Sequence, residues 1–355
     1  MPVVSSHNEW DPLEEVVVGR VDGAMTSSWE VLDRISVPPA AQEHLGVSAG
    51  TRMPQEVVEE AERGLEELIG ILHDAHVTVR RPDPPDTSGP FATPAWAVAN
   101  GISAANPRDL LLVVGDEIIE VPMADRNRYF ETWPYRGLLT EYFERGARWT
   151  AAPKPRLLDA QYRPGYEIPP PDQEMTYLVT EAEPVFDAAD VMRCGRDLFM
   201  ERSHVTNALG LEWLRRHLGP GYRVHEVVSR YPRAMHIDTS LLPLAPGKVL
   251  VNPEFIDPEG LPSVFRSWDV LIPPEPVVTP VMQRGLMSAW SSLNVLMLDP
   301  DHVVVERSQT PLIKAFEQWG FDPVPCTFEH YTAFGGAFHC ATLDIRRTGP
   351  LETYF

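Results

Sequence analysis

The feature that most constrains the fold is a pattern that occurs five times along the chain. Each copy predicts an apolar strand, a tight polar or glycine turn, a second apolar strand, a helix and a third strand. The clearest copy begins with a hairpin over residues 110–121, which turns at Gly115 and Asp116. It continues with a helix over 135–144 and a strand over 148–151.

Three further copies follow the same plan. Their hairpins are predicted over 186–200, 240–252 and 294–306, their helices over 207–218, 261–267 and 311–319, and their third strands over 222–228, 270–274 and 323–327. The fifth copy is split between the termini, with a strand over 341–345 from the C-terminal end and a strand, helix and strand over 14–20, 56–75 and 77–81 from the N-terminal end. Because pairing the first and last elements leaves no free sheet edge, we expect one closed α/β ring of five units in a single domain, 1–355.

The composition excludes several classes of protein. A net charge of −21 argues against a nucleic acid partner, and it either draws in a cationic small molecule or keeps the protein soluble. No apolar run approaches the roughly 18 residues of a membrane span, and the N-terminus lacks the features of a signal peptide, so we expect no membrane contact and a cytoplasmic location. The three cysteines, Cys194, Cys326 and Cys340, show no CxxC spacing, which indicates neither a disulfide framework nor a metal site.

Polar residues occur at the start of the first strand in every unit. They are Asp109, Asp187, His236 with Asp238, Ser288 with Asn294, and Cys340. Equivalent positions in a closed ring of repeats face one central cavity, so we expect these side chains to meet there. Gly335 and Gly336 precede Cys340 and allow a tight turn with close approach of a ligand. The thiol is therefore expected at the mouth of a cavity, as a nucleophile.

Each of these residues also has a plainer interpretation. Cys340 is then a small buried hydrophobe, His236 a core histidine, Asp187 a turn cap, Asp109 the partner of Arg108 at a surface turn, and Ser288 a solvent-facing helix residue. The combination nevertheless has a chemical logic, because a thiolate attacks, a histidine moves protons and carboxylates hold a cation. The residues indicate a cysteine-dependent transferase or hydrolase that acts on a cationic group.

Ordered motifs along most of the chain resemble those of one enzyme family. They include HNEWDPLEEVVVGR, PRDLLLVVGDEIIEVPMADRNRYFE, FDAADVMRCGRDLF, MHID, NVLMLD and FHCATLDIRRTGPLETY. The sequence is similar to the amidinotransferases, which include arginine:glycine amidinotransferase and the inosamine-phosphate amidinotransferases. The resemblance implies a pentein-type fold, a five-bladed α/β propeller of ββαβ units with pseudo-fivefold symmetry. We also expect a homodimer.

The resemblance also implies a role for each site residue. It makes Cys340 the nucleophile, His236 the acid/base, Asp187 its carboxylate partner, Asp109 and Asp238 ligands of the donor guanidinium, and Ser288 a contact of the donor's amino acid part. The implied reaction moves the amidino group of L-arginine through an amidino-Cys340 intermediate to an amine, glycine-like or an amino sugar or aminocyclitol of secondary metabolism, and releases ornithine. It needs neither a metal nor an organic cofactor. The alternatives are a guanidine hydrolase of the arginine deiminase kind and a non-catalytic arginine-binding protein.

Two departures from the family pattern concern the donor's carboxylate. After Asn252 and Pro253, where relatives have an arginine that helps to hold this group, the chain has Glu254 and Phe255. The segment RYPRA before MHID also differs and places Arg233 near the cavity. Arg233 is therefore the cation that we expect to bind the donor carboxylate in place of the missing arginine.

Overall fold

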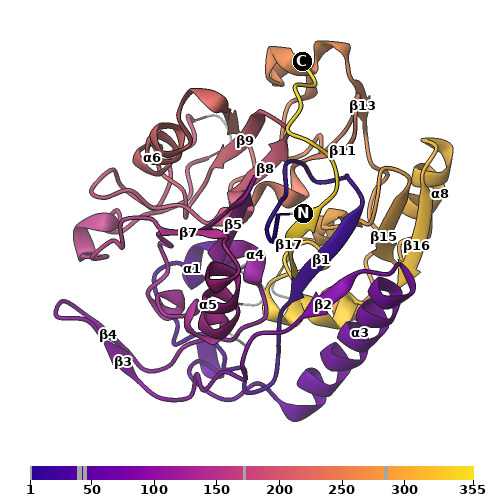
Figure 1. Cartoon of the computed structure of the whole chain (residues 1–355). Coiled ribbons are helices and arrows are strands. Elements are labelled where there is room, and N and C mark those ends of the chain that lie inside the picture. Colours follow the sequence, from indigo (N-terminus) through magenta and orange to yellow (C-terminus); the bar gives the residue numbers. More distant parts are fainter. Residues whose placement is uncertain (1, 38–41, 43–45, 171–172, 284–286) are drawn as a thin grey trace.

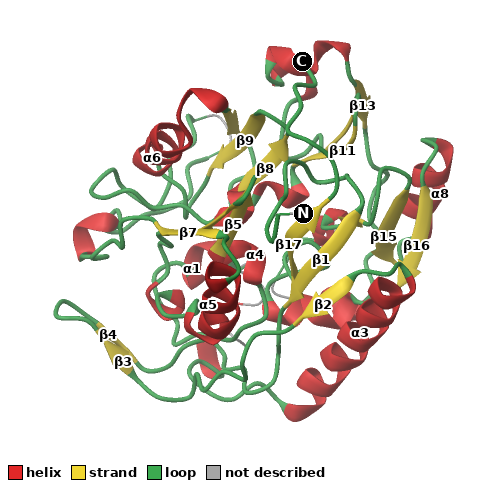
Figure 2. Ribbon diagram, viewed as in Figure 1, coloured by secondary structure: helices red, strands yellow, loops and turns green. Residues whose placement is uncertain are grey.

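Within the described residues, five three-stranded sheets form the framework of the chain. Figures 1 and 2 show how the labelled strands and helices are arranged. The structure is a computed structural model that describes residues 2–37, 42, 46–170, 173–283 and 287–355. The clearest copy of the sequence pattern, over residues 110–151, forms one of these sheets. In it, β5 (Leu111–Val114) pairs antiparallel with β6 (Glu117–Glu120). Helix α5 (Arg136–Glu144) then returns the chain so that β7 (Arg148–Ala151) lies parallel to β6.

The other four sheets repeat this order of one antiparallel and one parallel pair. Their strands are β8 (Val191–Cys194), β9 (Asp197–Arg202) and β10 (Arg223–Val228); β11 (Leu241–Ala245), β12 (Lys248–Val251) and β13 (Asp269–Leu271); β14 (Leu296–Met297), β15 (His302–Glu306) and β16 (Asp322–Cys326); and β17 (Thr342–Arg347), β1 (Leu13–Val18) and β2 (Thr78–Arg80). The repeated pattern in the sequence therefore predicts the sheets correctly.

α-Helices connect the second and third strands of these sheets in all but one case. They are α6 (Ala208–Leu218), α8 (Thr310–Gln318) and α3 (Gln55–Asp74). The short helix predicted over 261–267 is present as the 3₁₀ helix Ser263–Ser267, and a second 3₁₀ segment, Pro258–Gly260, precedes it. Pro258, Gly260 and Pro262 explain why this connection does not form a longer α-helix, since proline and glycine disfavour a continuous α-helix.

The remaining elements are short. They are α1 (Asp33–Ser36), α4 (Pro107–Leu110), α7 (Pro280–Gln283) and the two-stranded sheet of β3 (Phe91–Ala92) and β4 (Ala97–Val98), which projects from the body of the molecule (Figure 1). Within the described residues, none of the helices combines the length and the apolar character that crossing a bilayer requires.

The two ends of the chain meet in one sheet, as the split fifth copy predicts. Val16 of β1 pairs with Asp344 of β17, and Val18 pairs with Thr342. Figure 1 shows the indigo β1 and the yellow β17 side by side. The termini are therefore joined through backbone hydrogen bonds, while closure of the five sheets into a ring stays a prediction.

Burial falls from the first strand of each sheet to the third. β5, β8, β11 and β14 are buried at every position, whereas β7 and β13 expose residues at both faces. Neighbouring first strands also contact one another, β17 with β5 and β8 with β11. The first strands therefore form the interior of the molecule, and their N-terminal ends bring residues from different sheets together.

A group of five charged residues, which we call the buried ion cluster, lies among these first strands. Arg193 Nη2 donates to Glu9 Oε2 and to Asp344 Oδ2, both at 2.6 Å. Arg108 Nη2 donates to Asp344 Oδ1 at 2.7 Å, and Arg347 Nε donates to Asp344 Oδ2 at 2.8 Å. All five side chains are buried, so each carboxylate is compensated by a guanidinium instead of by water.

This pairing predicts a large loss of stability for Arg193→Ala. The substitution removes the ion pairs of Arg193 with Glu9 and Asp344. Breaking a buried ion pair lowers the free energy of unfolding by about 3–5 kcal/mol. Urea unfolding at neutral pH measures the free energy of unfolding. As a control, Arg215→Ala removes an exposed contact with Glu212 and is expected to cost at most about 1 kcal/mol. Equal midpoints for the two variants would contradict the role of the cluster.

Candidate active site

Cys340 lies directly before β17, at the end of a turn that requires glycine. Gly335 adopts a φ of 80°, and a Cβ added to Gly336 would lie 2.5 Å from Asn106 Oδ1 and 2.6 Å from Cys340 Cβ. Asn294 holds the cysteine on its other side, because its Oδ1 accepts from the Cys340 N–H at 3.1 Å and its Nδ2 donates to Sγ at 3.2 Å. The position of the sulfur is thus defined by two sheets.

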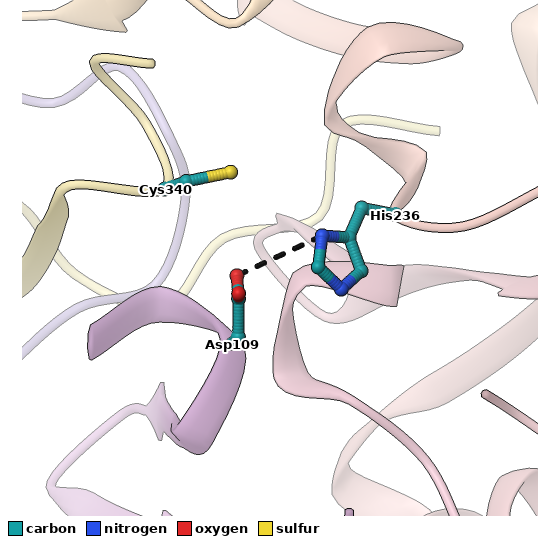
Figure 3. Close-up of side chains that lie close together, drawn as sticks. All are labelled: Asp109, His236 and Cys340. Atoms are coloured by element: carbon teal, nitrogen blue, oxygen red, sulfur yellow. Dashed lines mark ion pairs between the residues drawn. The ribbon is translucent and has the colours of Figure 1, made fainter. Parts of the chain in front are cut away.

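His236 stands between two carboxylates, as expected from the sequence. Its Nε2 lies 3.1 Å from Asp187 Oδ2 and its Nδ1 lies 3.7 Å from Asp109 Oδ1. Burial alone lowers the pKa of His236, but the charges of Asp109 and Asp187 raise it well above 6.5. The two carboxylates therefore favour the protonated ring, and Figure 3 shows the ring beside Asp109 with the sulfur of Cys340 directed toward the same space.

The backbone of His236 is strained. Its φ is 67°, a left-handed value that non-glycine residues rarely adopt, and its N–H donates to Asp190 Oδ1 at 2.9 Å. Burial raises the pKa of Asp190 to about 7. A strained backbone conformation of this kind persists only where surrounding contacts hold it in place, and such positions cluster at functional sites. The buried hydrogen bond from His236 to Asp190 is such a contact.

Asp109 and Asp238 complete the site. Asp238 Oδ2 accepts from Cys340 Sγ at 3.2 Å and lies 2.9 Å from His339 Nδ1, while Asp109 Oδ2 accepts from Arg128 Nη1 at 2.9 Å. The plainer interpretation of Asp109, a surface pair with Arg108, is wrong, because Asp109 is buried and pairs with Arg128. Among the described residues, Asp109 Oδ1, Asp187 Oδ1 and Asp238 Oδ1 have no hydrogen-bond partner.

These unpaired oxygens indicate a cationic ligand with several N–H groups. A buried polar atom without a partner is destabilising, and three carboxylate oxygens around one imidazole and one thiol leave the site short of hydrogen-bond donors. A planar guanidinium supplies five N–H donors in a fixed arrangement. The site is therefore suited chemically to hold a guanidinium against the sulfur of Cys340.

Cys340 is buried, with 1% of its surface exposed, so the expectation of a thiol at the mouth of a cavity is wrong. The side chains of Asn294 and Asp238 contact the sulfur and cover it. Burial, followed by the charges of Asp238 and Asp109, raises the pKa of Cys340 to about 12. Without a bound cation, these surroundings therefore favour the neutral thiol of Cys340.

Ligand atoms of Asp109, His236 and Cys340 also lie within 4.8 Å of one another, a grouping that metal ions use. A metal needs the lone pair of a neutral imidazole, whereas the two carboxylates keep His236 protonated. The electrostatics thus favour an organic cation. The expected absence of a metal and of a cofactor stays a prediction.

Ser288 and Arg233 make their described contacts away from the sulfur. Ser288 precedes the 3₁₀ segment Ala289–Leu293 and its Oγ accepts from Trp290 N at 3.3 Å. The Arg233 guanidinium donates to the carbonyl oxygens of Ile35 and Val37. Their contacts with the donor stay predictions.

Two site residues, Arg128 and His339, escaped the sequence-based assignment. Asn294 was among the polar residues expected at the cavity but had no assigned role. His339 is adjacent to Cys340 in the sequence, which is the one signal that pointed to it. Arg128 carries no signal of its own, because its pairing with Asp109 arises only in the folded chain.

Comparisons with known proteins agree with this chemistry, although no protein-family profile matches the chain. The chain is 45% identical over 351 residues to the L-arginine:L-lysine amidinotransferase of Pseudomonas savastanoi pv. phaseolicola, covering 99% of this chain and 96% of that protein. Among solved structures it is similar to SxtG, an amidinotransferase from the Microseira wollei saxitoxin biosynthetic pathway, with 54% identity, 99% of each chain covered and a TM-score of 0.93.

A second solved structure, the inosamine-phosphate amidinotransferase StrB1 from Streptomyces griseus, is 42% identical, with 100% of this chain and 99% of that chain covered and a TM-score of 0.91. The N-terminal domain of ArgZ, an arginine dihydrolase from cyanobacteria, has a TM-score of 0.62 at 13% identity and shares the fold alone. The sequence, the thiol–imidazole–carboxylate site and the full-length similarity agree: the chain belongs to the amidinotransferase family, whose members transfer an amidino group.

Proposed function

We propose that this enzyme moves the amidino group of L-arginine through a covalent amidino-Cys340 intermediate to an amine and releases ornithine. The observation that carries the proposal is the set of three unpaired carboxylate oxygens beside a buried thiol and a protonated imidazole. Asp109 and Asp238 then bind the guanidinium nitrogens, and the cation beside the sulfur lowers the pKa of Cys340 from its high unliganded value. Donor binding thereby activates the nucleophile.

In the first half-reaction, binding of the donor cation releases the thiol proton of Cys340 to solvent, and the resulting thiolate attacks the guanidinium carbon of arginine. His236, protonated between Asp109 and Asp187, gives its proton to the departing nitrogen, so that the carbon–nitrogen bond breaks and ornithine leaves as an amine. The amidino group remains bonded to sulfur. Asp187 keeps the ring oriented throughout, because its Oδ2 lies 3.1 Å from Nε2.

In the second half-reaction, an acceptor amine enters. Neutral His236 takes a proton from this amine, the nitrogen attacks the amidino carbon, and the thiolate of Cys340 leaves. The names of three relatives contain lysine, glycine or inosamine phosphate. We propose that the acceptor of this enzyme is likewise a primary amine, either a small amino acid or an amino sugar or aminocyclitol. Full-length relatives at 42–54% identity are amidinotransferases, whereas the arginine dihydrolase is 13% identical, which favours transfer over hydrolysis.

We also propose that the five sheets close into a five-bladed propeller in one domain. The burial of the first strands and the contacts of β17 with β5 and of β8 with β11 support this arrangement. A homodimer and a cytoplasmic location remain part of the proposal.

The covalent step predicts an observable burst. Enzyme mixed with arginine alone is expected to release about one equivalent of ornithine per active site and to gain the amidino mass on the peptide that contains Cys340. Cys340→Ala should give neither product, whereas Cys194→Ala, a matched control at a buried cysteine outside the site, should retain both. Mass spectrometry of the intact protein and of its peptides checks both results.

The acceptor step separates the three candidate functions. Labelled arginine is incubated with glycine, lysine, amino sugars and inosamines, and the products are identified by mass spectrometry. Transfer gives ornithine with a labelled guanidino product, hydrolysis gives citrulline with ammonia or a urea product with ornithine, and a non-catalytic binding protein leaves arginine unchanged. Citrulline or urea formation at an equal rate with and without amines would contradict amidino transfer.

The buried thiol predicts an unusual pH dependence of alkylation. With a pKa of about 12 for Cys340, the thiolate fraction should rise with pH, so the rate with iodoacetamide is expected to increase from about pH 7 to about pH 10 without a plateau. An ordinary thiol with a pKa of about 8.5 levels off within that range. Cys340→Ala reports the background from Cys194 and Cys326. A plateau near neutral pH would mean that the thiolate exists before the donor binds.

The role of Arg233 is tested with a donor that lacks the carboxylate. If Arg233 binds this group, arginine should be a better donor than agmatine, and Arg233→Ala should reduce kcat/KM for arginine on the order of tenfold to a hundredfold, with agmatine little affected. Arg230→Ala is the control, since Arg230 is exposed and lies on the same segment. An equal decrease of kcat/KM with arginine and with agmatine would contradict binding of the donor carboxylate by Arg233. It would indicate that Arg233 acts through its hydrogen bonds to the carbonyl groups of Ile35 and Val37 instead.

A further inference from the structure

His339 is a second buried histidine beside the nucleophile, and the proposed reaction gives it no task. Its side chain is 5% exposed. Its Nδ1 lies 2.9 Å from Asp238 Oδ2, and its Nε2 lies 3.4 Å from Glu9 Oε2. The ring thus connects the carboxylate that contacts the sulfur with a carboxylate of the buried ion cluster.

Both ring nitrogens of His339 therefore face groups that only accept hydrogen bonds when ionised. The contact from Nδ1 to Asp238, at 2.9 Å, has an ordinary hydrogen-bond distance, whereas the contact from Nε2 to Glu9, at 3.4 Å, is long, so the geometry places a proton on Nδ1 facing Asp238. Glu9 is held ionised, because Arg193 Nε donates to its Oε1 at 2.7 Å and Arg193 Nη2 to its Oε2 at 2.6 Å. Although burial acts to raise the pKa of Glu9, Arg193 keeps it well below the ordinary range.

The carboxylates on the two sides of the His339 ring also have other contacts. On one side, Arg108 Nη1 lies 3.5 Å from Glu9 Oε2, so Glu9 faces Arg108, Arg193 and His339. On the Asp238 side, the carboxylate contacts Cys340 Sγ and the ring. A small cavity borders His339 and Glu9, and its other lining residues, Met192, Leu242, Pro243, Leu244, Val295 and Met297, are apolar.

We propose that His339 acts as a positioning residue, a clamp on Asp238: its Nδ1–H donates to Asp238, so that Oδ2 stays against the sulfur and the unpaired Oδ1 stays free for the donor guanidinium. This role rests on the proposed function, because it matters only if a guanidinium binds at Asp238. Glu9 and the buried ion cluster fix the far side of the ring. The clamp therefore links the sheet of β17 and the cluster to the binding of the donor.

Two substitutions separate the two ends of the ring. In His339→Asn the amide nitrogen occupies a place close to that of Nδ1, so it can still donate to Asp238. In His339→Gln the amide extends toward Glu9 and the contact with Asp238 is lost. We expect KM for arginine to rise on the order of tenfold to a hundredfold in His339→Gln, with a smaller change in kcat and partial rescue in His339→Asn.

Binding is measured without chemistry by calorimetric titration of arginine into Cys340→Ala and into the double variant that adds His339→Gln. Weaker binding only in the double variant supports the clamp, and equal binding overturns it. If Cys340→Ala itself binds no arginine, the proposed function fails at the donor step, which is a different result. Thermal unfolding of each variant identifies any that do not fold.

The proton on Nδ1 is tested on the wild-type enzyme, so the proposal does not depend on whether a variant folds. Selective ¹⁵N-histidine labelling, with the ring signal assigned through its correlations to the backbone, should show a proton on Nδ1 of His339. A bare Nδ1 overturns the proposal, because only a protonated Nδ1 can donate to Asp238.

Discussion

The pairing of Arg193 with Glu9 and Asp344 is the interaction on which the rest of the structure depends. Arg193 lies on β8, Glu9 on the N-terminal segment and Asp344 on β17, so one guanidinium joins a central sheet to both ends of the chain. None of these groups can return to water without moving a fully buried strand. The position of β17, and with it that of Cys340, follows from satisfying these charges.

The carboxylates of the candidate active site, in contrast to those of the buried ion cluster, are not fully compensated by the chain's own cations. Asp109 and Asp187 flank His236, whereas Asp238 faces His339, and Arg128 supports only Asp109 among these three carboxylates directly. The chain therefore satisfies every carboxylate of the buried ion cluster with its own cations but leaves acceptor oxygens at the site without hydrogen-bond partners. Under the proposed function, the guanidinium of the substrate supplies the missing hydrogen-bond donors, so that donor binding is coupled to activation of the thiol.

Much of this arrangement was predictable, because it follows from local periodicity. The five hairpin and third-strand units, the joining of the termini and the meeting of Cys340, His236 and Asp187 depend on equivalent positions in a repeat. The burial of Cys340 was not predictable, since it results from Asp238 and Asn294, which lie in and at the end of the 3₁₀ segments before β11 and β14, packing on the sulfur. For the same reason, long-range contacts such as the salt bridge between Arg128 and Asp109 have no periodic signal.

The departure at Glu254 and Phe255 is more than the loss of an arginine. Phe255 is buried and stacks on Tyr231 with ring centroids 3.9 Å apart, and its carbonyl accepts from Arg230 N at 2.7 Å. The aromatic pair therefore anchors the segment that leads to the strained His236. A guanidinium could not take this place without bringing an unpaired charge into an apolar stack. Under the proposed function, recognition of the donor's carboxylate falls to other residues, and the segment that Phe255 anchors carries Arg233.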